Sequence, residues 1–290
     1  MEARQRFPVL TALVFIVALS FAGGVAWGQS LPIVKYPDIP YGPSETDFRN
    51  WLDVYAPADA QGAPVVLFVH GGAWASGDKS EYVELGRTLA GYYGYVTVVI
   101  NYRLSPDVVH PAHTEDATLA TVWTLENIAD YGGDPTELFL FGHSAGGHIV
   151  SLMATDESFL EAQGHFTEEI AGVISMSGVY NLNALVPAMI GTVYDTFGSL
   201  DPAYLAEVSP ATHVDDWQPP FLIEYAEDDL PTFDRQARNF YRNLLRHGSE
   251  ATLVRFDNLT HVTEIKAVST KTPDSKPVSV LVDFIDGIVD

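Results

Sequence analysis

Residues 138–150 read LFLFGHSAGGHIV, and this stretch decides the fold. The apolar run Leu138–Phe141 predicts a buried strand, and the apolar residues that follow Gly147 predict a helix. Ser144 stands between two glycines at the junction, where a side chain on Gly142 or Gly146 would collide with the neighbouring strand or helix. A strand that enters a helix through a strained G-x-S-x-G turn exposes the serine hydroxyl, so Ser144 is predicted to be a nucleophile. The same five letters also occur in glycine-rich turns without chemistry, so the rest of the chain has to supply the other catalytic groups.

Similar apolar runs recur on both sides of this turn, each followed by a loop and then usually by a helix-like stretch. Runs without alternation are typical of strands buried on both faces. The alternation of strand and helix predicts an α/β fold with a mostly parallel, doubly wound sheet. Two earlier strands, 33–36 and 51–55, are expected to pair antiparallel. The other predicted strands are 65–69, 96–100, 138–141, 170–176, 221–225 and 253–256, and the predicted helices are 82–90, 115–129, 147–154, 234–247 and 278–289.

The segment His70-Gly71-Gly72-Ala73-Trp74 directly follows the strand predicted at 65–69. Adjacent glycines let a backbone approach a ligand closely, so the N–H groups of Gly72 and Ala73 are expected to form an oxyanion hole with that of Ala145. Trp74 either stacks on the substrate or forms a wall that holds the loop. His70 is expected to brace the loop through a hydrogen bond.

These two motifs, HGGAW and GHSAG, resemble the α/β-hydrolase esterases of the HGGxW and GxSxG type. That neighbourhood contains acetyl and feruloyl esterases, kynurenine formamidases and relatives of hormone-sensitive lipase. The resemblance runs roughly from Trp51 to the C-terminus. It implies the α/β-hydrolase fold with an eight-stranded type of sheet, and a serine esterase that works through an acyl-enzyme without cofactor or metal. Further matching pieces are LDVYAP (52–57), NYRL (101–104) and YGGDP (131–135).

The fold implied by this resemblance places the catalytic groups in the order serine, acid, histidine. Beyond the strand at 221–225 stand two histidines, His247 and His261. His247 adjoins Gly248 at a helix end and is interpreted as a capping residue, so His261, expected in a mobile loop after a late strand, is the predicted base. The resemblance places the acid in a GxxD turn, and with Ala226 in the glycine position the match falls on Asp229. Three consecutive acids leave Asp228 as the alternative.

Residues 180–217 form a long irregular stretch that is expected to fold over the site as a small lid. Its apolar residues Met189, Val193, Tyr194 and Phe197 are candidates for the substrate pocket, and Tyr194 and Trp74 are the predicted substrate-binding residues. His110 and His113 have a spacing that could suit a metal, but Pro111 interrupts the helical spacing. We therefore interpret them as structural and predict no metal site.

Composition narrows the class of protein further. The chain has no cysteine, which excludes disulfides, thiolate metal sites and a cysteine nucleophile. A formal net charge of −23 disfavours nucleic acid and anionic membranes as partners. Residues 1–28 combine Arg4 and Arg6, an apolar stretch and the small residues Ala26 and Gly28, which predicts a cleaved signal peptide and a secreted or periplasmic catalytic domain at 29–290. An uncleaved membrane anchor is the alternative.

The predicted activity is hydrolysis of small or soluble esters, with acetyl or feruloyl esters of polysaccharides as candidate substrates. Two other functions stay open from the sequence. The first is amide hydrolysis by an arylformamidase that resembles kynurenine formamidase. The second is a non-catalytic binding module built on the hydrolase fold, which the presence of serine, acid and histidine disfavours.

Overall fold

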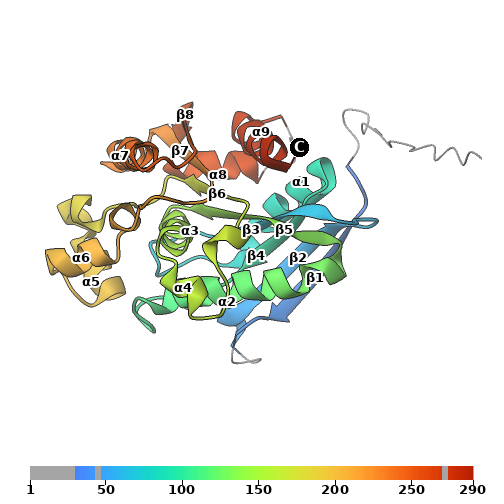
Figure 1. Cartoon of the computed structure of the whole chain (residues 1–290), viewed down its shortest axis with the longest axis horizontal. Helices are drawn as coiled ribbons and strands as arrows, with labels where there is room; N and C mark the ends of the chain where they lie inside the picture. Colours follow the sequence, from blue (N-terminus) through green and yellow to red (C-terminus); the bar gives the residue numbers. More distant parts are fainter. Residues whose placement is uncertain (1–29, 43–46, 270–273, 290) are drawn as a thin grey trace, which may run out of the picture. The chain divides into compact units, whose positions relative to one another are not determined.

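An eight-stranded sheet forms the centre of the computed structural model, which describes residues 30–42, 47–269 and 274–289 (Figure 1). The strand order is β1-β2-β4-β3-β5-β6-β7-β8. The pairs β1–β2 and β2–β4 are antiparallel, and all other neighbours are parallel. The strands are β1 (Ile33–Pro40), β2 (Trp51–Pro57), β3 (Ala63–Val69), β4 (Val96–Ile100), β5 (Gly133–His143), β6 (Gly172–Met176), β7 (Phe221–Asp228) and β8 (Ala251–Thr260).

This topology confirms the predicted fold class and the antiparallel N-terminal pair. Side chains alternate between the two faces of the sheet along each strand. In β3, Leu67 and Val69 enter the core on one face, whereas Val66 and Phe68 enter the core on the other. Burial on both faces explains why the sequence shows continuous apolar runs rather than alternation.

Helices cover both faces of this sheet (Figure 1). Helices α1, α8 and α9 contribute apolar residues to one core, and α2, α3 and α7 contribute to the other. The five predicted helices are present, and α4, α5, α6 and α8 were not predicted. A helix of one or two turns is too short for its hydrophobic period to show. The bounds are α1 (Val83–Tyr93), α2 (Ala112–Asn127), α3 (Ala145–Thr155), α4 (Ser158–Glu161), α5 (Ile190–Phe197), α6 (Pro202–Glu207), α7 (Phe233–Arg246), α8 (His261–Val268) and α9 (Lys276–Val289).

The stretch 180–217 is more regular than the sequence indicated. It contains α5 and α6, which lie together at one end of the molecule in Figure 1, and the short 3-10 helices Leu182–Ala184, Pro187–Met189 and Pro210–Thr212. Val193 and Phe197 lie one turn apart on α5 and are both buried. Phe197 makes edge-to-face contact with Trp74, and the ring centroids are 5.3 Å apart. The segment is therefore packed onto the oxyanion loop.

All the elements described from β1 onward belong to one compact unit that begins at Leu31. The predicted signal peptide, residues 1–28, lies outside the described residues, so its cleavage stays a prediction. Within the described ranges, we find no helix of the length and apolar character that a membrane crossing requires.

Candidate active site

Ser144 occupies a tight turn between β5 and α3, at the carboxyl end of the parallel strands. Its φ of 56° and ψ of −116° lie in a region that residues other than glycine rarely adopt. A Cβ on Gly142 would lie 2.3 Å from the carbonyl oxygen of Gly146, and a Cβ on Gly146 would lie 2.0 Å from that of Val69. The two glycines are thus required by close backbone packing, as the sequence predicted, and the strained serine faces the site.

His261, which lies far from Ser144 in the sequence, contacts its side chain in the fold. Its Nε2 lies 2.9 Å from Ser144 Oγ, and its Nδ1 lies 2.7 Å from Asp229 Oδ1. The expectation of a mobile loop was wrong, because His261 is the first residue of α8. Thr260 caps that helix, because its hydroxyl oxygen accepts a hydrogen bond from the N–H of Thr263. The hydroxyl oxygen of Thr263 in turn accepts a hydrogen bond from the N–H of Thr260. The predicted base therefore lies at a capped helix end rather than on a flexible segment.

The structure distinguishes the two candidate acids. Asp229, whose side chain is 2% exposed, contacts His261, whereas Asp228 is exposed and pairs with Thr260 at the end of β7. Burial raises the pKa of Asp229, but hydrogen bonds from His261 and from Ser177 outweigh burial and hold this pKa below its ordinary value. Asp229 is consequently an anion at neutral pH, which fixes the proton of His261 on Nδ1 and leaves Nε2 free to accept a proton.

The oxyanion loop has an unusual backbone. Gly72, Ala73 and Trp74 follow one another with φ of 124°, 52° and 58°. His70 is fully buried and donates from Nδ1 to the carbonyl of Gly71 over 2.7 Å, so it braces the loop as expected. Among the described residues, the backbone N–H groups of Gly72, Ala73 and Ala145 donate to no protein acceptor. These three residues line the same cavity as Ser144, so their N–H groups are free to bind an oxyanion there.

A cavity of about 590 Å³ opens above Ser144. Such a volume is within the range usual for small-molecule sites. Trp74 lines it but is 1% exposed and packs edge-to-face on His148 and Phe197, which favours its role as a wall. Further lining residues are Gly71, Ser76, Gly77, Glu81, Tyr82, His143, Val179, Met189, Leu230, Phe233, His261, Val262, Ile265, Lys266 and Ser269.

The prediction that Tyr194 lines the pocket was wrong. Its side chain is 56% exposed and lies outside the cavity lining. Val193 and Phe197 occupy the buried face of α5, and a helix turns the next position along, Tyr194, about 100° away from that face. Of the four candidates from this segment, Met189 alone lines the cavity among the residues described.

Two functional contacts were missed by sequence reasoning. Ser177 follows β6 with a φ of 46° and donates from Oγ to Asp229 Oδ2 over 2.5 Å. The position of Ser177 just after an apolar run could have indicated this contact, because the carboxyl ends of parallel strands lie together at the site. Glu264, about one turn after His261 on α8, is fully buried. The helical spacing between His261 and Glu264 could have indicated this contact. It was overlooked because the segment was predicted to be a loop.

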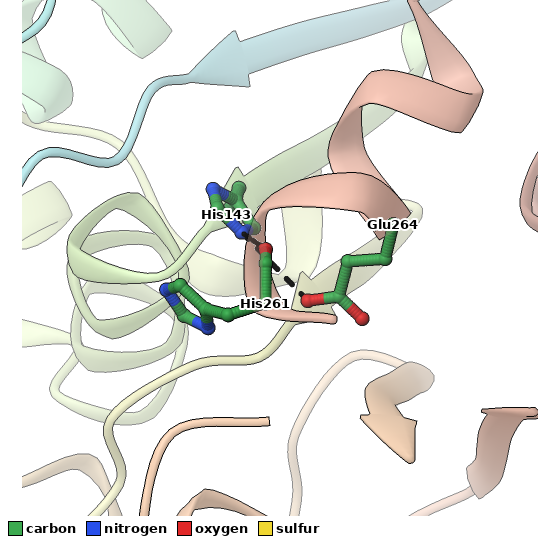
Figure 2. Close-up of side chains that lie close together, drawn as sticks. All are labelled: His143, His261 and Glu264. Carbon is green, nitrogen blue, oxygen red and sulfur yellow. Dashed lines mark hydrogen bonds and ion pairs between the residues drawn. The ribbon is translucent and has the colours of Figure 1, made fainter. Parts of the chain in front are cut away.

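His143, His261 and Glu264 lie close together, with candidate ligand atoms within 4.8 Å of one another (Figure 2). In the structure the two histidines make other contacts. The two ring nitrogens of His261 face Ser144 and Asp229, and His143 Nε2 lies 2.9 Å from the backbone carbonyl of His261. Because a carbonyl only accepts, His143 carries its proton on Nε2. His143 therefore supports the main chain of His261 through a hydrogen bond, and Glu264 Oε1 lies 3.7 Å from the same nitrogen.

Comparison with known families agrees with this geometry. Residues 52–244, well over half of the 290-residue chain, match the BD-FAE family. The chain belongs to the BD-FAE family. Within this BD-FAE match lie the oxyanion loop, Ser144 and Asp229, while His261 follows it.

The BD-FAE chain is also similar to a curated protein, esterase LipQ of Mycobacterium tuberculosis. The two are 32% identical over 267 residues, which cover 86% of this chain and 62% of LipQ. The chain spans about half to three fifths of the length of the curated relatives it matches.

Solved structures show the same fold as this BD-FAE chain. Phosphonate-inhibited esterase B from Lactobacillus rhamnosis superposes with a TM-score of 0.76 at 23% identity, covering 90% of this chain and 88% of that one. A truncated carbohydrate esterase from gut microbiota gives a TM-score of 0.73 at 19% identity, covering 88% and 96%. These similarities show the α/β-hydrolase fold.

Proposed function

We propose that this protein is a serine carboxylic-ester hydrolase with Ser144 as nucleophile, His261 as base and Asp229 as the acid that orients it. The observation that carries the proposal is the continuous set of contacts from Ser144 Oγ through His261 to Asp229. This set shares a cavity with three backbone N–H groups that have no acceptor among the described residues. A base, an oriented tautomer and an oxyanion hole are the parts that acyl transfer needs.

In this mechanism, His261 Nε2 takes the proton of Ser144 while Ser144 Oγ attacks the ester carbonyl. The tetrahedral oxyanion is bound by the N–H groups of Gly72, Ala73 and Ala145. His261 then gives the proton to the leaving alcohol, and the acyl group remains on Ser144. Water, activated by the same histidine, releases the acid and restores the serine.

The proposed substrates are small or soluble esters, with acetyl or feruloyl esters of polysaccharides as the first to test. The acyl and alcohol portions share one cavity of about 590 Å³, which Trp74 and Met189 help to line. An open rim of polar residues, among them Glu81 and Lys266, suits an alcohol portion that remains in water. A carbohydrate esterase among proteins of the same fold adds support for a polysaccharide-linked ester.

We expect kcat/KM to be highest for short acyl chains in a series of p-nitrophenyl esters and to fall as the chain lengthens. The reason is that a longer acyl chain competes with the alcohol portion for the same cavity. Acetylated xylan and methyl ferulate should be hydrolysed in parallel assays, and N-formylkynurenine should react more slowly. Preference for N-formylkynurenine over every ester would favour an arylformamidase. Inactivity toward all of these substrates would favour a binding module.

We also propose that the protein is exported and that residues 1–28 are removed. The support is the sequence pattern of basic start, apolar stretch and small residues at Ala26 and Gly28. When the full chain is expressed in a bacterial host, mass spectrometry of the exported protein should find Gln29 at the N-terminus. An Ala26→Trp variant should accumulate uncleaved, because signal cleavage needs a small residue there. Intact wild-type chain retained in the membrane fraction would contradict the proposal.

A further inference from the structure

Two buried carboxyl groups, Glu264 on α8 and Glu224 on β7, have no part in the mechanism described above. Glu264 and Glu224 are both 0% exposed, and in the described part of the chain none of their four carboxyl oxygens has a hydrogen-bond partner. Burial raises the pKa of Glu264 to about 9 and that of Glu224 well above its ordinary value. Both groups are therefore protonated and neutral at neutral pH.

Glu264 lies close to His143 and His261, as Figure 2 shows. It is three residues after His261 on α8, so the two occupy neighbouring positions on one side of the helix. Glu264 Oε1 lies 3.7 Å from His143 Nε2, the same atom that donates to the backbone carbonyl of His261. The Ser177 hydroxyl lies close enough to lower the pKa of Glu264 against the effect of burial, and it donates to Asp229.

We propose that Glu264 is a positioning residue of the triad, which as a neutral carboxyl holds the first turn of α8 against His143 and Ser177. This inference rests on the proposed function, because it assigns the residue a role in the action of His261. A first turn of α8 fixed in this way keeps the imidazole at hydrogen-bond distance from both Ser144 and Asp229. Displacement of a catalytic group by about 1 Å is enough to lower a rate on the order of 100-fold.

The groups that face Glu264 require it to stay neutral. His143 faces it from β5, Ser177 follows β6, and the carboxyls of Glu224 and Asp229 approach from β7 and its end. Burial, the charge of Asp229 and the nearby carboxyl of Glu224 all act against an anion at this position. Helix α9, which packs against α8, contributes buried apolar residues such as Leu281 and Ile285. An ionised Glu264 would stand beside the anionic Asp229 with no compensating cation among the residues that the structure describes, and repulsion would displace the first turn of α8.

The test compares the pH dependence of kcat for the wild-type protein and Glu264→Gln. Below its pKa, Glu264 is neutral, so the glutamine variant should keep kcat within about twofold of wild type at pH 7. As the pH rises through about 9, Glu264 ionises and wild-type kcat should fall. The glutamine variant cannot ionise and should not show this fall. Glu161→Gln, which removes an exposed carboxyl on α4, is the matched control and should follow the wild-type profile.

Three further variants separate positioning from bulk packing. Glu264→Ala should lower kcat on the order of 10-fold to 100-fold with little change in KM, because the substrate cavity keeps its walls while the base loses its support. His143→Leu removes the N–H that binds the carbonyl of His261 and should have a similar effect. His143→Gln places an amide N–H near the position of Nε2 and should restore much of the activity.

The outcomes distinguish this inference from the function on which it rests. An alkaline fall that is identical in wild type and Glu264→Gln would overturn the positioning role, as would full kcat in Glu264→Ala. The rate at which a fluorophosphonate modifies Ser144, followed by intact mass, gives the same pH profiles without any ester substrate. If that rate shows the predicted difference while no ester is hydrolysed, the positioning role stands and the proposed function fails.

Discussion

A Ser144→Ala variant is expected to lose kcat toward esters on the order of 10⁶-fold, as other serine triads do when the nucleophile is removed. Ser144 Oγ is the atom that His261 Nε2 contacts at 2.9 Å, and no other hydroxyl among the described residues contacts His261. The oxyanion hole and the cavity remain in this variant. They should leave a residual acceleration of about 10³-fold to 10⁴-fold over the reaction in water. Steady-state kinetics on p-nitrophenyl acetate measures both quantities.

The fold of this variant should be unchanged, because alanine needs no more space than serine at position 144. The midpoint of thermal unfolding, followed by circular dichroism, is the check. Ser158→Ala, which removes an exposed hydroxyl on α4, is the matched control and should keep wild-type kcat. Full esterase activity in Ser144→Ala would contradict the proposed mechanism. Equal losses of kcat in both variants would indicate a general loss of structure.

Local geometry explains why the nucleophile turn was readable from sequence. Strand, turn and helix are consecutive there, and the turn cannot form unless Gly142 and Gly146 lack side chains. The same holds for the HGGAW loop, where a Cβ on Gly72 would lie 2.1 Å from the carbonyl oxygen of Ser76. In both places the backbone geometry restricts the residue type, so the residue types themselves predict the local structure.

The surroundings of the base could not be read in the same way. His261 opens a helix of only eight residues, whose cap is Thr260 and whose buried residues include Glu264. Two turns are too few for an amphipathic period to emerge, and a glutamate in that period argues for exposure rather than burial. The contacts of Ser177 and Glu264 depend on β6, β7 and α8 meeting in space. No local sequence pattern specifies how these three elements pack together.

Residues 180–217 show a similar limit on what the sequence predicts. The apolar residues Met189, Val193, Tyr194 and Phe197 of this segment were predicted to line the substrate pocket, but sequence does not say whether such residues pack on substrate or on protein. Phe197 turns out to pack on Trp74 and His148, so it supports the oxyanion loop instead of facing the cavity. Tyr194, its neighbour on the helix, is left in solvent.

The second large effect is expected for Asp229→Asn, which should lower kcat on the order of 10⁴-fold at neutral pH. In the wild type, Asp229 accepts from His261 Nδ1, from Ser177 Oγ and from the backbone N–H groups of Leu230 and Ala226. An asparagine has one acceptor oxygen and one NH₂ group for these four donors. Whichever way the amide is turned, its NH₂ group meets a donor.

The consequence for the base differs between the two amide orientations, and both are unfavourable. With NH₂ toward His261, Nδ1 has to accept, so the ring proton moves to Nε2 and the histidine can no longer take the proton of Ser144. With oxygen toward His261, NH₂ opposes the N–H of Ala226 at the other position, and the negative charge that stabilises the imidazolium is absent in either case.

Asp228→Asn is the matched control, because it makes the same chemical change one residue earlier on an exposed side chain. Its kcat should stay within about twofold of wild type, as is usual for an exposed surface substitution. Measured together, the two variants decide which of the adjacent acids acts in the triad. A loss in Asp228→Asn equal to that in Asp229→Asn would contradict the assignment. A kcat in Asp229→Asn close to wild type would mean that the anion is unnecessary, and that the contact at 2.7 Å orients the histidine without contributing its charge.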